Sequence, residues 1–141
     1  MKEIFNAINI LVKSGTSKKN LSILHCNTEY PASINNLNLL SIKYMRDHLK
    51  MNIGYSDHSE GYEASLIAMS LGAKILEKHF TLNKNLKGPD HKASLSPEEM
   101  IEYVKKIRLF EQSLGKYEKK PYRKELEISK VVRKKILAKK D

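Results

Sequence analysis

Apolar residues recur along the chain at spacings that alternate between helix-like and strand-like. Near the N-terminus they lie three and four positions apart, which predicts a helix over residues 4–12, and Gly15 follows as a typical residue after a helix end. The next apolar segments predict, in order, a strand at 21–26, a helix at 37–49, a strand at 51–56, a helix at 64–71 before Gly72, and a strand at 74–80.

The last long helix has the clearest start signal. Ser96 is a favoured N-cap, Pro97 suits the first helical position, and Glu99 completes a capping box. Gly115 marks the end. A weaker helical segment follows at 126–137. One face of the long helix is expected to carry its larger apolar residues, which are Met100, Tyr103, Val104, Ile107, Phe110 and Leu114.

The resulting order, α-β-α-β-α-β-α, is typical of parallel βα units and predicts the α/β class. Three parallel strands form either a small open sheet or a slice of a larger barrel. The chain opens on a helix and stops at Asp141 within a charged run, and its 141 residues are fewer than the roughly 250 of a complete (β/α)8 barrel. The pattern therefore favours a segment of a barrel.

Composition indicates a globular domain, because 40% of the residues are hydrophobic. No apolar run approaches the length of a membrane span, and the first residues do not resemble a cleavable signal peptide. Cys26 is the only cysteine and has no partner for an internal disulfide, so we expect a reducing, cytoplasmic setting.

The net charge of +10 is concentrated in the C-terminal part of the chain. Residues 105–141 carry fourteen Lys and Arg against five Asp and Glu, whereas residues 1–104 carry twelve against eleven. Such a tail could contact phosphates of a nucleic acid, or it could form a solvated face. The second reading is favoured, since Tyr117 and Tyr122 do not interleave with the basic residues as base-stacking aromatics do.

Polar side chains follow each predicted strand, where parallel α/β folds place their functional groups. Neighbouring strands lie about 5 Å apart, so His58 and His79 are expected to approach one point above the sheet. Two imidazoles there could hold a divalent metal with other coordination positions open. Two hydrogen-bonded core histidines remain an equally good interpretation of the spacing alone.

His25 and Cys26 are interpreted differently. His25 lies within the first predicted strand and is expected to pack or to form a hydrogen bond. Adjacent strand residues project to opposite faces, so Cys26 and His25 do not form a nucleophile pair.

Four motifs in order resemble the N-acetylneuraminate (sialic acid) synthase family. They lie at residues 24–32 (LHCNTEYPA), 54–61 (GYSDHSEG), 75–82 (ILEKHFTL) and 88–94 (GPDHKAS). The family is a (β/α)8 barrel followed by an antifreeze-like domain, and it works as a homodimer. The resemblance implies that the three strands are the sixth to eighth of the barrel.

The resemblance also implies a domain division. Residues 1–115 would be a partial barrel, and residues 116–141 a basic linker whose last part, 133–141, resembles the lead-in to the antifreeze-like domain. The first barrel half, with residues that contact phosphoenolpyruvate, has no counterpart in this chain. We therefore expect the isolated chain to be inactive.

By position in the motifs, His58 and His79 resemble the ligands of the catalytic metal, usually Mn²⁺ with Mg²⁺ as the alternative. Ser56, Thr28 and Asn27 resemble contacts to phosphoenolpyruvate.

Residues that resemble hydrogen-bonding partners of the open-chain sugar are Tyr30, Glu77 and Asp90. For Glu77 the alternative is a salt bridge to a strand-end lysine. For Asp90 it is a turn cap after Gly88 and Pro89.

The implied reaction condenses phosphoenolpyruvate with N-acetylmannosamine, or a related N-acylated amino sugar, to a nine-carbon 2-keto acid with release of phosphate. No nucleic-acid or membrane partner is expected. The alternatives are a legionaminic acid synthase fragment, a non-catalytic remnant, and a basic nucleic-acid-binding module.

Overall fold

The computed structural model describes residues 1–136, and its elements follow the predicted order. They are α1 (Lys2–Lys13), β1 (Ser22–Cys26), α2 (Leu40–Leu49), β2 (Asn52–Asp57), α3 (Glu63–Ser70), β3 (Ile75–Lys78), α4 (Pro97–Leu114) and α5 (Arg123–Val132). The predicted start of α2 was early. A 3₁₀ turn at Ile34–Asn36 and a left-handed Asn38, with φ of 44°, keep the backbone non-helical until Leu39.

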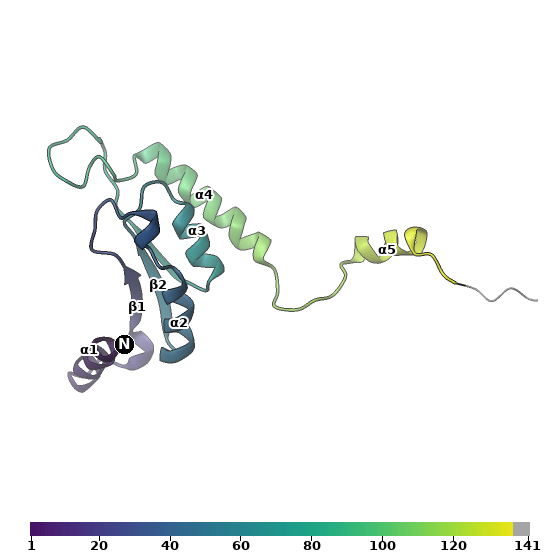
Figure 1. Ribbon diagram of the computed structural model, residues 1–141, viewed down its shortest axis with the longest axis horizontal. Coiled ribbons are helices and arrows are strands. Elements are labelled where there is room, and N and C mark those ends of the chain that lie inside the picture. Colours follow the sequence, from purple (N-terminus) through teal and green to yellow (C-terminus); the bar gives the residue numbers. More distant parts are fainter. Residues whose placement is uncertain (137–141) are drawn as a thin grey trace, which may run out of the picture.

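The three strands form one parallel sheet in the order β1-β2-β3. In its register, Cys26 lies opposite Ser56, and Ser56 lies opposite Glu77. Parallel neighbours in sequence order require a crossover between strands, and α2 and α3 supply the two crossovers (Figure 1). The predicted α/β class is confirmed.

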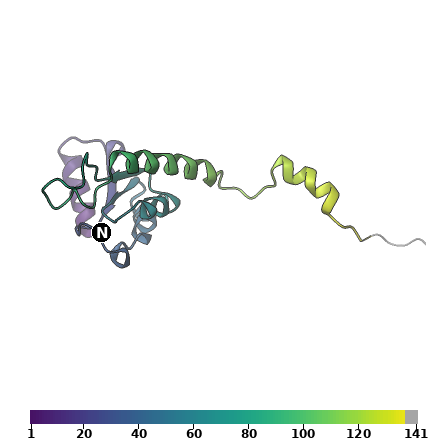
Figure 2. The same cartoon turned by 90° about the horizontal axis from the view of Figure 1, so that it is seen from above.

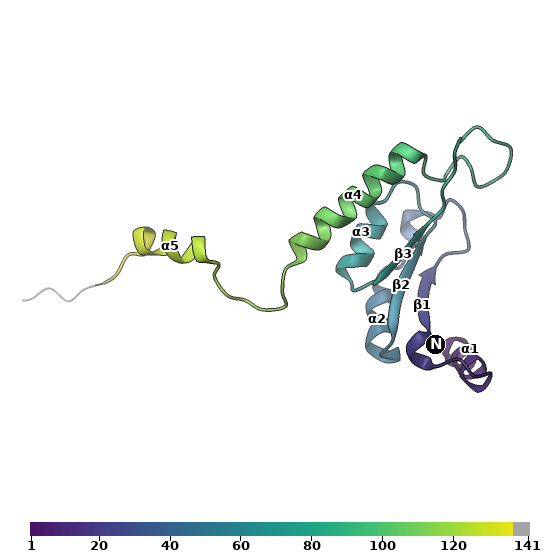
Figure 3. The same cartoon turned by 180° about the vertical axis from the view of Figure 1, so that it is seen from behind.

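The two faces of the sheet have different surroundings. Ile53, Tyr55 and Asp57 of β2 are completely or almost completely buried under the helices, since α2 and α3 pack on β2 and α4 packs on α3 (Figure 3). The side chains between them in sequence project to the other face, where Cys26 and Glu77 of the neighbouring strands are exposed. One face therefore holds the core, and the other is open.

Helix α4 begins as predicted. The Ser96 Oγ accepts from the Glu99 N–H at 3.3 Å, and the Glu99 carboxylate accepts from the Ser96 N–H at 2.8 Å. Its apolar face is only partly covered, because Tyr103 is buried while Val104 and Leu114 are 45% and 48% exposed.

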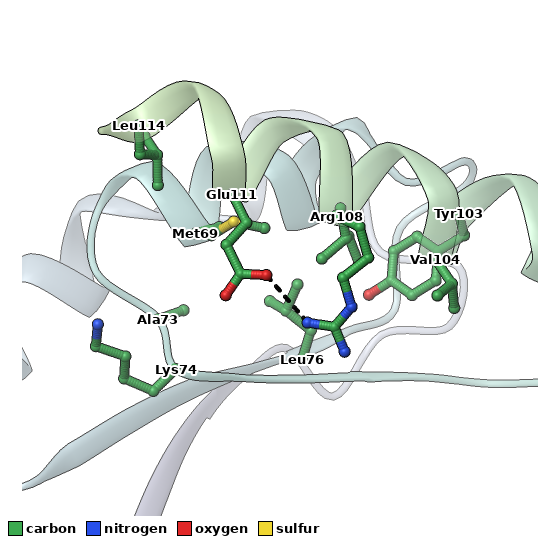
Figure 4. A pocket seen from close by; sticks show the side chains of 10 residues that line it. Met69, Ala73, Lys74, Leu76, Tyr103, Val104, Arg108, Glu111 and Leu114 are labelled. Atoms are coloured by element: carbon green, nitrogen blue, oxygen red, sulfur yellow. Dashed lines mark hydrogen bonds and ion pairs between the residues drawn. The ribbon is translucent and has the colours of Figure 1, made fainter. Parts of the chain in front are cut away.

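A hollow of about 350 Å³ lies beneath the C-terminal half of α4 (Figure 4). Met69 and Leu76 form its floor, and the ion pair between Arg108 and Glu111, at 3.1 Å, lies along its rim.

Beyond α4 the chain extends away from the sheet and forms α5 (Figure 2). No residue of α5 is buried, so this helix takes no part in the core. The predicted helical segment at 126–137 overlaps α5, and its last residue lies outside the described residues, as do the last five of the lead-in motif at 133–141. No helix within residues 1–136 combines the length and apolarity that a membrane span requires.

Candidate active site at the strand ends

Three rings meet where the strands end, and we call them the ring cluster: Tyr30, His58 and His79. The two imidazoles lie edge to face with centroids 5.0 Å apart. The Tyr30 ring stacks on His79 at 4.2 Å and meets His58 edge-on at 5.1 Å. The prediction that the two histidines approach one point is confirmed.

Tyr30 reaches the imidazoles because its loop is fixed to two other segments. The N–H of Ala32 donates to the His58 carbonyl at 2.8 Å, and the Tyr30 hydroxyl lies 3.1 Å from the Ser94 Oγ in the loop after β3. Burial raises the pKa of the Tyr30 phenol, and the Asp90 carboxylate adds to this while the Ser94 hydrogen bond opposes it. The phenol is therefore protonated at neutral pH and can donate.

Ser56 and Glu77 face each other across β2 and β3 on the open face. The Ser56 hydroxyl donates to the Glu77 carboxylate at 2.6 Å. The alternative of a salt bridge between Glu77 and the strand-end lysine is wrong, because Lys78 projects to the helix-covered face and pairs there with Asp57 at 3.3 Å.

The turn cap considered for Asp90 is present, and its carboxylate lies beside His79. Its backbone carbonyl accepts from the N–H and hydroxyl of Ser94, at 3.0 and 2.7 Å, and so caps the turn. Its carboxylate is exposed and lies 3.8 Å from the His79 Nδ1. This turn and His79 border a hollow of about 270 Å³, which Asp90 and His91 also line.

The two other predicted contact residues lie on the loop after β1. The Asn27 amide donates to the Asn36 carbonyl at 2.8 Å, while its Oδ1 is buried and has no hydrogen-bond partner among residues 1–136. Thr28 is exposed. The amide of Asn27 thus fixes the loop to the segment around Asn36.

His25 has the structural role expected of it. Its Nε2 lies 2.8 Å from the Leu37 carbonyl, and its ring stacks on Tyr55 at 5.9 Å on the covered face. Cys26 projects to the opposite face, as predicted, where its Sγ lies 3.7 Å from the His58 Nε2. The sequence interpretation missed this contact, because it depends on the register that pairs Cys26 with Ser56, two residues before His58.

The ring cluster suits a divalent cation in its donor type. His58 and His79 supply two imidazoles whose centroids lie 5.0 Å apart, and imidazole is a common ligand of transition metals. Within residues 1–136 no set of three or more His, Cys, Asp or Glu residues is arranged to hold a metal. A cation bound by two imidazoles would retain open positions for oxygen ligands.

A buried polar network lies on the other face, directly behind the ring cluster. Asp57 accepts from Ser59 and Ser65 hydroxyls at 2.6 Å each, and Tyr103 donates to Ser65 at 3.2 Å. Burial lowers the pKa of Lys78, and the Asp57 carboxylate opposes that shift. Sequence reasoning did not find this network, because Ser65, Lys78 and Tyr103 come from segments that are distant from Asp57 along the chain.

Comparison with known proteins shows that the chain is similar in sequence to part of two larger synthases. It is 46% identical over 139 residues to the N,N'-diacetyllegionaminic acid synthase of Campylobacter jejuni, covering 99% of this chain and 42% of the relative. It is 40% identical over 116 residues to the human N-acetylneuraminate-9-phosphate synthase, covering 82% of this chain and 31% of the relative. The chain therefore spans less than half of either.

The fold has a solved counterpart. The crystal structure of the N-acetylneuraminic acid synthetase of Leptospira borgpetersenii, in complex with citrate, matches with a TM-score of 0.80 and 33% identity, over 95% of this chain and 47% of that protein. The sequence profile of the NeuB family matches residues 1–119, which include every strand and the ring cluster. The chain belongs to the NeuB family.

Proposed function

We propose that residues 1–115 form the C-terminal part of a (β/α)8 barrel, with β1, β2 and β3 as its sixth to eighth strands. The support is that β1 and β3 are edge strands here, whereas a closed barrel has no edges. Residues 116–141 would link this barrel to a further domain, because α5 contributes nothing to the core.

The barrel would condense phosphoenolpyruvate with an N-acylated amino sugar such as N-acetylmannosamine. The observation that carries this proposal is the convergence of His58, His79 and Tyr30 at the strand ends, beside two carboxylates, in a chain of this family. Mn²⁺, or Mg²⁺ in its place, would be held by the two imidazoles, and it would supply Lewis acidity toward the sugar aldehyde oxygen.

The chain's own residues would position the two reactants. The Ser56 hydroxyl, which now donates to Glu77, would instead donate to the anionic phosphoenolpyruvate. The Asn27 Oδ1 and Thr28 would add polar contacts to the same substrate. The open-chain sugar would accept a hydrogen bond from the protonated Tyr30 phenol and donate hydrogen bonds to the Glu77 and Asp90 carboxylates.

In the reaction, the methylene carbon of phosphoenolpyruvate attacks the aldehyde carbon, and the aldehyde oxygen takes up a proton to become a hydroxyl. Water adds at the cationic carbon that bears the phosphate, one proton is lost, and phosphate leaves as the 2-keto group forms. Holding both reactants in attack geometry supplies much of the rate enhancement. The setting would be the cytoplasm, with a homodimer as the working unit.

A second candidate substrate is a 2,4-diacetamido sugar that leads to legionaminic acid. The higher identity to the Campylobacter synthase than to the human enzyme favours it. Assaying both amino sugars side by side decides between the two.

The test uses the complemented barrel, which we define as this chain produced together with the N-terminal segment of the Campylobacter relative that this chain does not match. Phosphate release is measured with phosphoenolpyruvate, Mn²⁺ and each amino sugar. Turnover is expected in the complemented barrel and lost in Glu77→Gln, while exposed His48→Ala on α2 serves as an unaffected control. Absence of turnover with both amino sugars would instead support a non-catalytic remnant. Rapid turnover by this chain alone would contradict the proposal that it forms only part of the barrel.

A further inference from the structure

Both histidines of the ring cluster lie just beyond the last paired residues of the sheet. The β2–β3 ladder ends at the pair Asp57 and Lys78, and each histidine is the first residue after its strand. Backbone hydrogen bonds between these strands therefore no longer fix the separation of His58 from His79.

A buried side-chain contact takes over at that point. The Lys78 Nζ lies 3.3 Å from the Asp57 Oδ1 and donates to the Ser59 carbonyl. Asp57 in turn accepts from the Ser59 N–H at 2.9 Å. Asp57 is 0% exposed, Ser59 is 1% exposed and the Lys78 side chain is 1% exposed. The ammonium group that precedes His79 thus contacts the residues on both sides of His58.

We propose that Asp57, Ser59 and Lys78 act as a clamp that sets the spacing and orientation of His58 and His79, so that Asp57 and Lys78 are positioning residues for the ligand pair. This inference rests on the proposed function, in which the two imidazoles bind the cation. Because neighbouring residues of a strand project to opposite faces, the clamp acts from the covered face on side chains of the open face.

The clamp is itself fixed to the helical layer. The Asp57 Oδ2 accepts from Ser65 of α3 at 2.6 Å, and Ser65 accepts from Tyr103 of α4 at 3.2 Å. A buried ion pair resists separation, because moving the two charges apart leaves each of them unpaired in apolar surroundings. Groups that orient metal ligands typically change metal affinity by about 10- to 100-fold when they are removed.

The test compares Asp57→Asn/Lys78→Met with Tyr103→Phe in the complemented barrel. The double variant removes both charges at similar volume, so no lone buried charge remains to unfold the protein. Tyr103→Phe weakens the same network on its helix side and leaves the clamp intact. Two quantities are measured: Mn²⁺ affinity by calorimetry, and nuclear Overhauser effects between the ring protons of His58 and His79 in the metal-free protein, with labelled histidine in this chain only.

We expect the double variant to remain folded, to lose the inter-ring effects, and to bind Mn²⁺ about 10- to 100-fold more weakly. Tyr103→Phe should keep both at wild-type values while losing thermal stability. Inter-ring effects at wild-type strength in the folded double variant would overturn the clamp, whatever the metal affinity. If those effects are lost but His58→Ala binds Mn²⁺ as the wild type does, the clamp stands and the proposed metal site fails.

Discussion

At the ends of β2 and β3, successive residues lie on opposite faces of the sheet, and the two faces differ in their exposure to water. On the covered face, Asp57 and Lys78 are excluded from water and their polar groups are paired within the chain. On the open face, the side chains of His79 and Asp90 are 35% and 54% exposed and lie 3.8 Å apart. The covered face thus satisfies its polar groups internally, whereas the open face leaves donors and acceptors available for a ligand.

The comparison teaches that similar residue types acquire different roles through a shift of one position along a strand. A histidine or a carboxylate on the covered face is paired within the core, whereas His79 and Asp90 on the open face are exposed to solvent. Each prediction below tests that division, beginning with the largest effect.

Breaking the buried pair by Lys78→Met alone should produce the largest loss of stability. The Asp57 carboxylate would stay buried without its cation, which costs about 3–5 kcal/mol. That is a large part of the roughly 5–15 kcal/mol by which domains are stable. Urea unfolding measures the loss, and Asp57→Asn/Lys78→Met should recover most of it. A single-variant loss below about 1 kcal/mol would contradict the buried ion pair.

On the open face, His58→Ala and His79→Ala should each weaken Mn²⁺ binding at least tenfold, or about 1.4 kcal/mol, by calorimetry. Their unfolding free energies should stay close to the wild-type value, because neither ring belongs to the core. His48→Ala on α2 is the matched control and should change neither quantity. Unchanged Mn²⁺ affinity in both His58→Ala and His79→Ala would remove the metal assignment.

His25→Ala should show the reverse behaviour, since His25 contacts Leu37 and Tyr55 on the covered face. Loss of its hydrogen bond and ring contact should cost about 1–2 kcal/mol in thermal unfolding, with Mn²⁺ affinity unchanged. A selective loss of Mn²⁺ affinity at full stability would place His25 with the ligands instead.

A smaller effect is expected at the start of α4. Ser96→Ala removes the N-cap acceptor and should cost about 1 kcal/mol. The Lys84 side chain and the Ser96 N–H lower the pKa of Glu99 by hydrogen bonding. Because the folded state favours the ionised form, this contribution is present at neutral pH and lost as pH falls below about 4. The unfolding free energies of the wild type and Glu99→Gln should therefore converge in acid. A difference between them that stays constant across pH would argue against these hydrogen bonds to the Glu99 carboxylate.

The smallest effect is expected for the tail, residues 117–141, because its described part, residues 117–136, packs on neither face of the sheet. We expect the full chain to bind DNA or RNA only weakly and without sequence selectivity. Deleting residues 117–141 should therefore cause no loss of selective binding. Fluorescence anisotropy over a range of salt concentrations measures this, because phosphate contacts give a steep salt dependence. Loss of tight, sequence-selective binding on deletion would support a nucleic-acid-binding role for the tail.

Much of the fold could be read from local sequence. The period of apolar residues located the strands, and Ser96, Pro97 and Glu99 located the start of α4, because helix caps involve residues within one turn. The predicted strands placed His58 and His79 at neighbouring strand ends, and parallel-strand spacing then brings them together. These properties depend on neighbours along the chain or on the fixed dimensions of a sheet.

Other features were decided only when the elements packed. Lys78 could have paired with Glu77 or with Asp57, and the helices that cover one face of the sheet selected Asp57. Cys26 was compared with its neighbour His25, while register brought it to His58 instead. The sequence determined which residues could form the site, because periodicity and capping are local. The tertiary structure decided which of them are buried and paired, because burial and partner choice depend on elements distant along the chain.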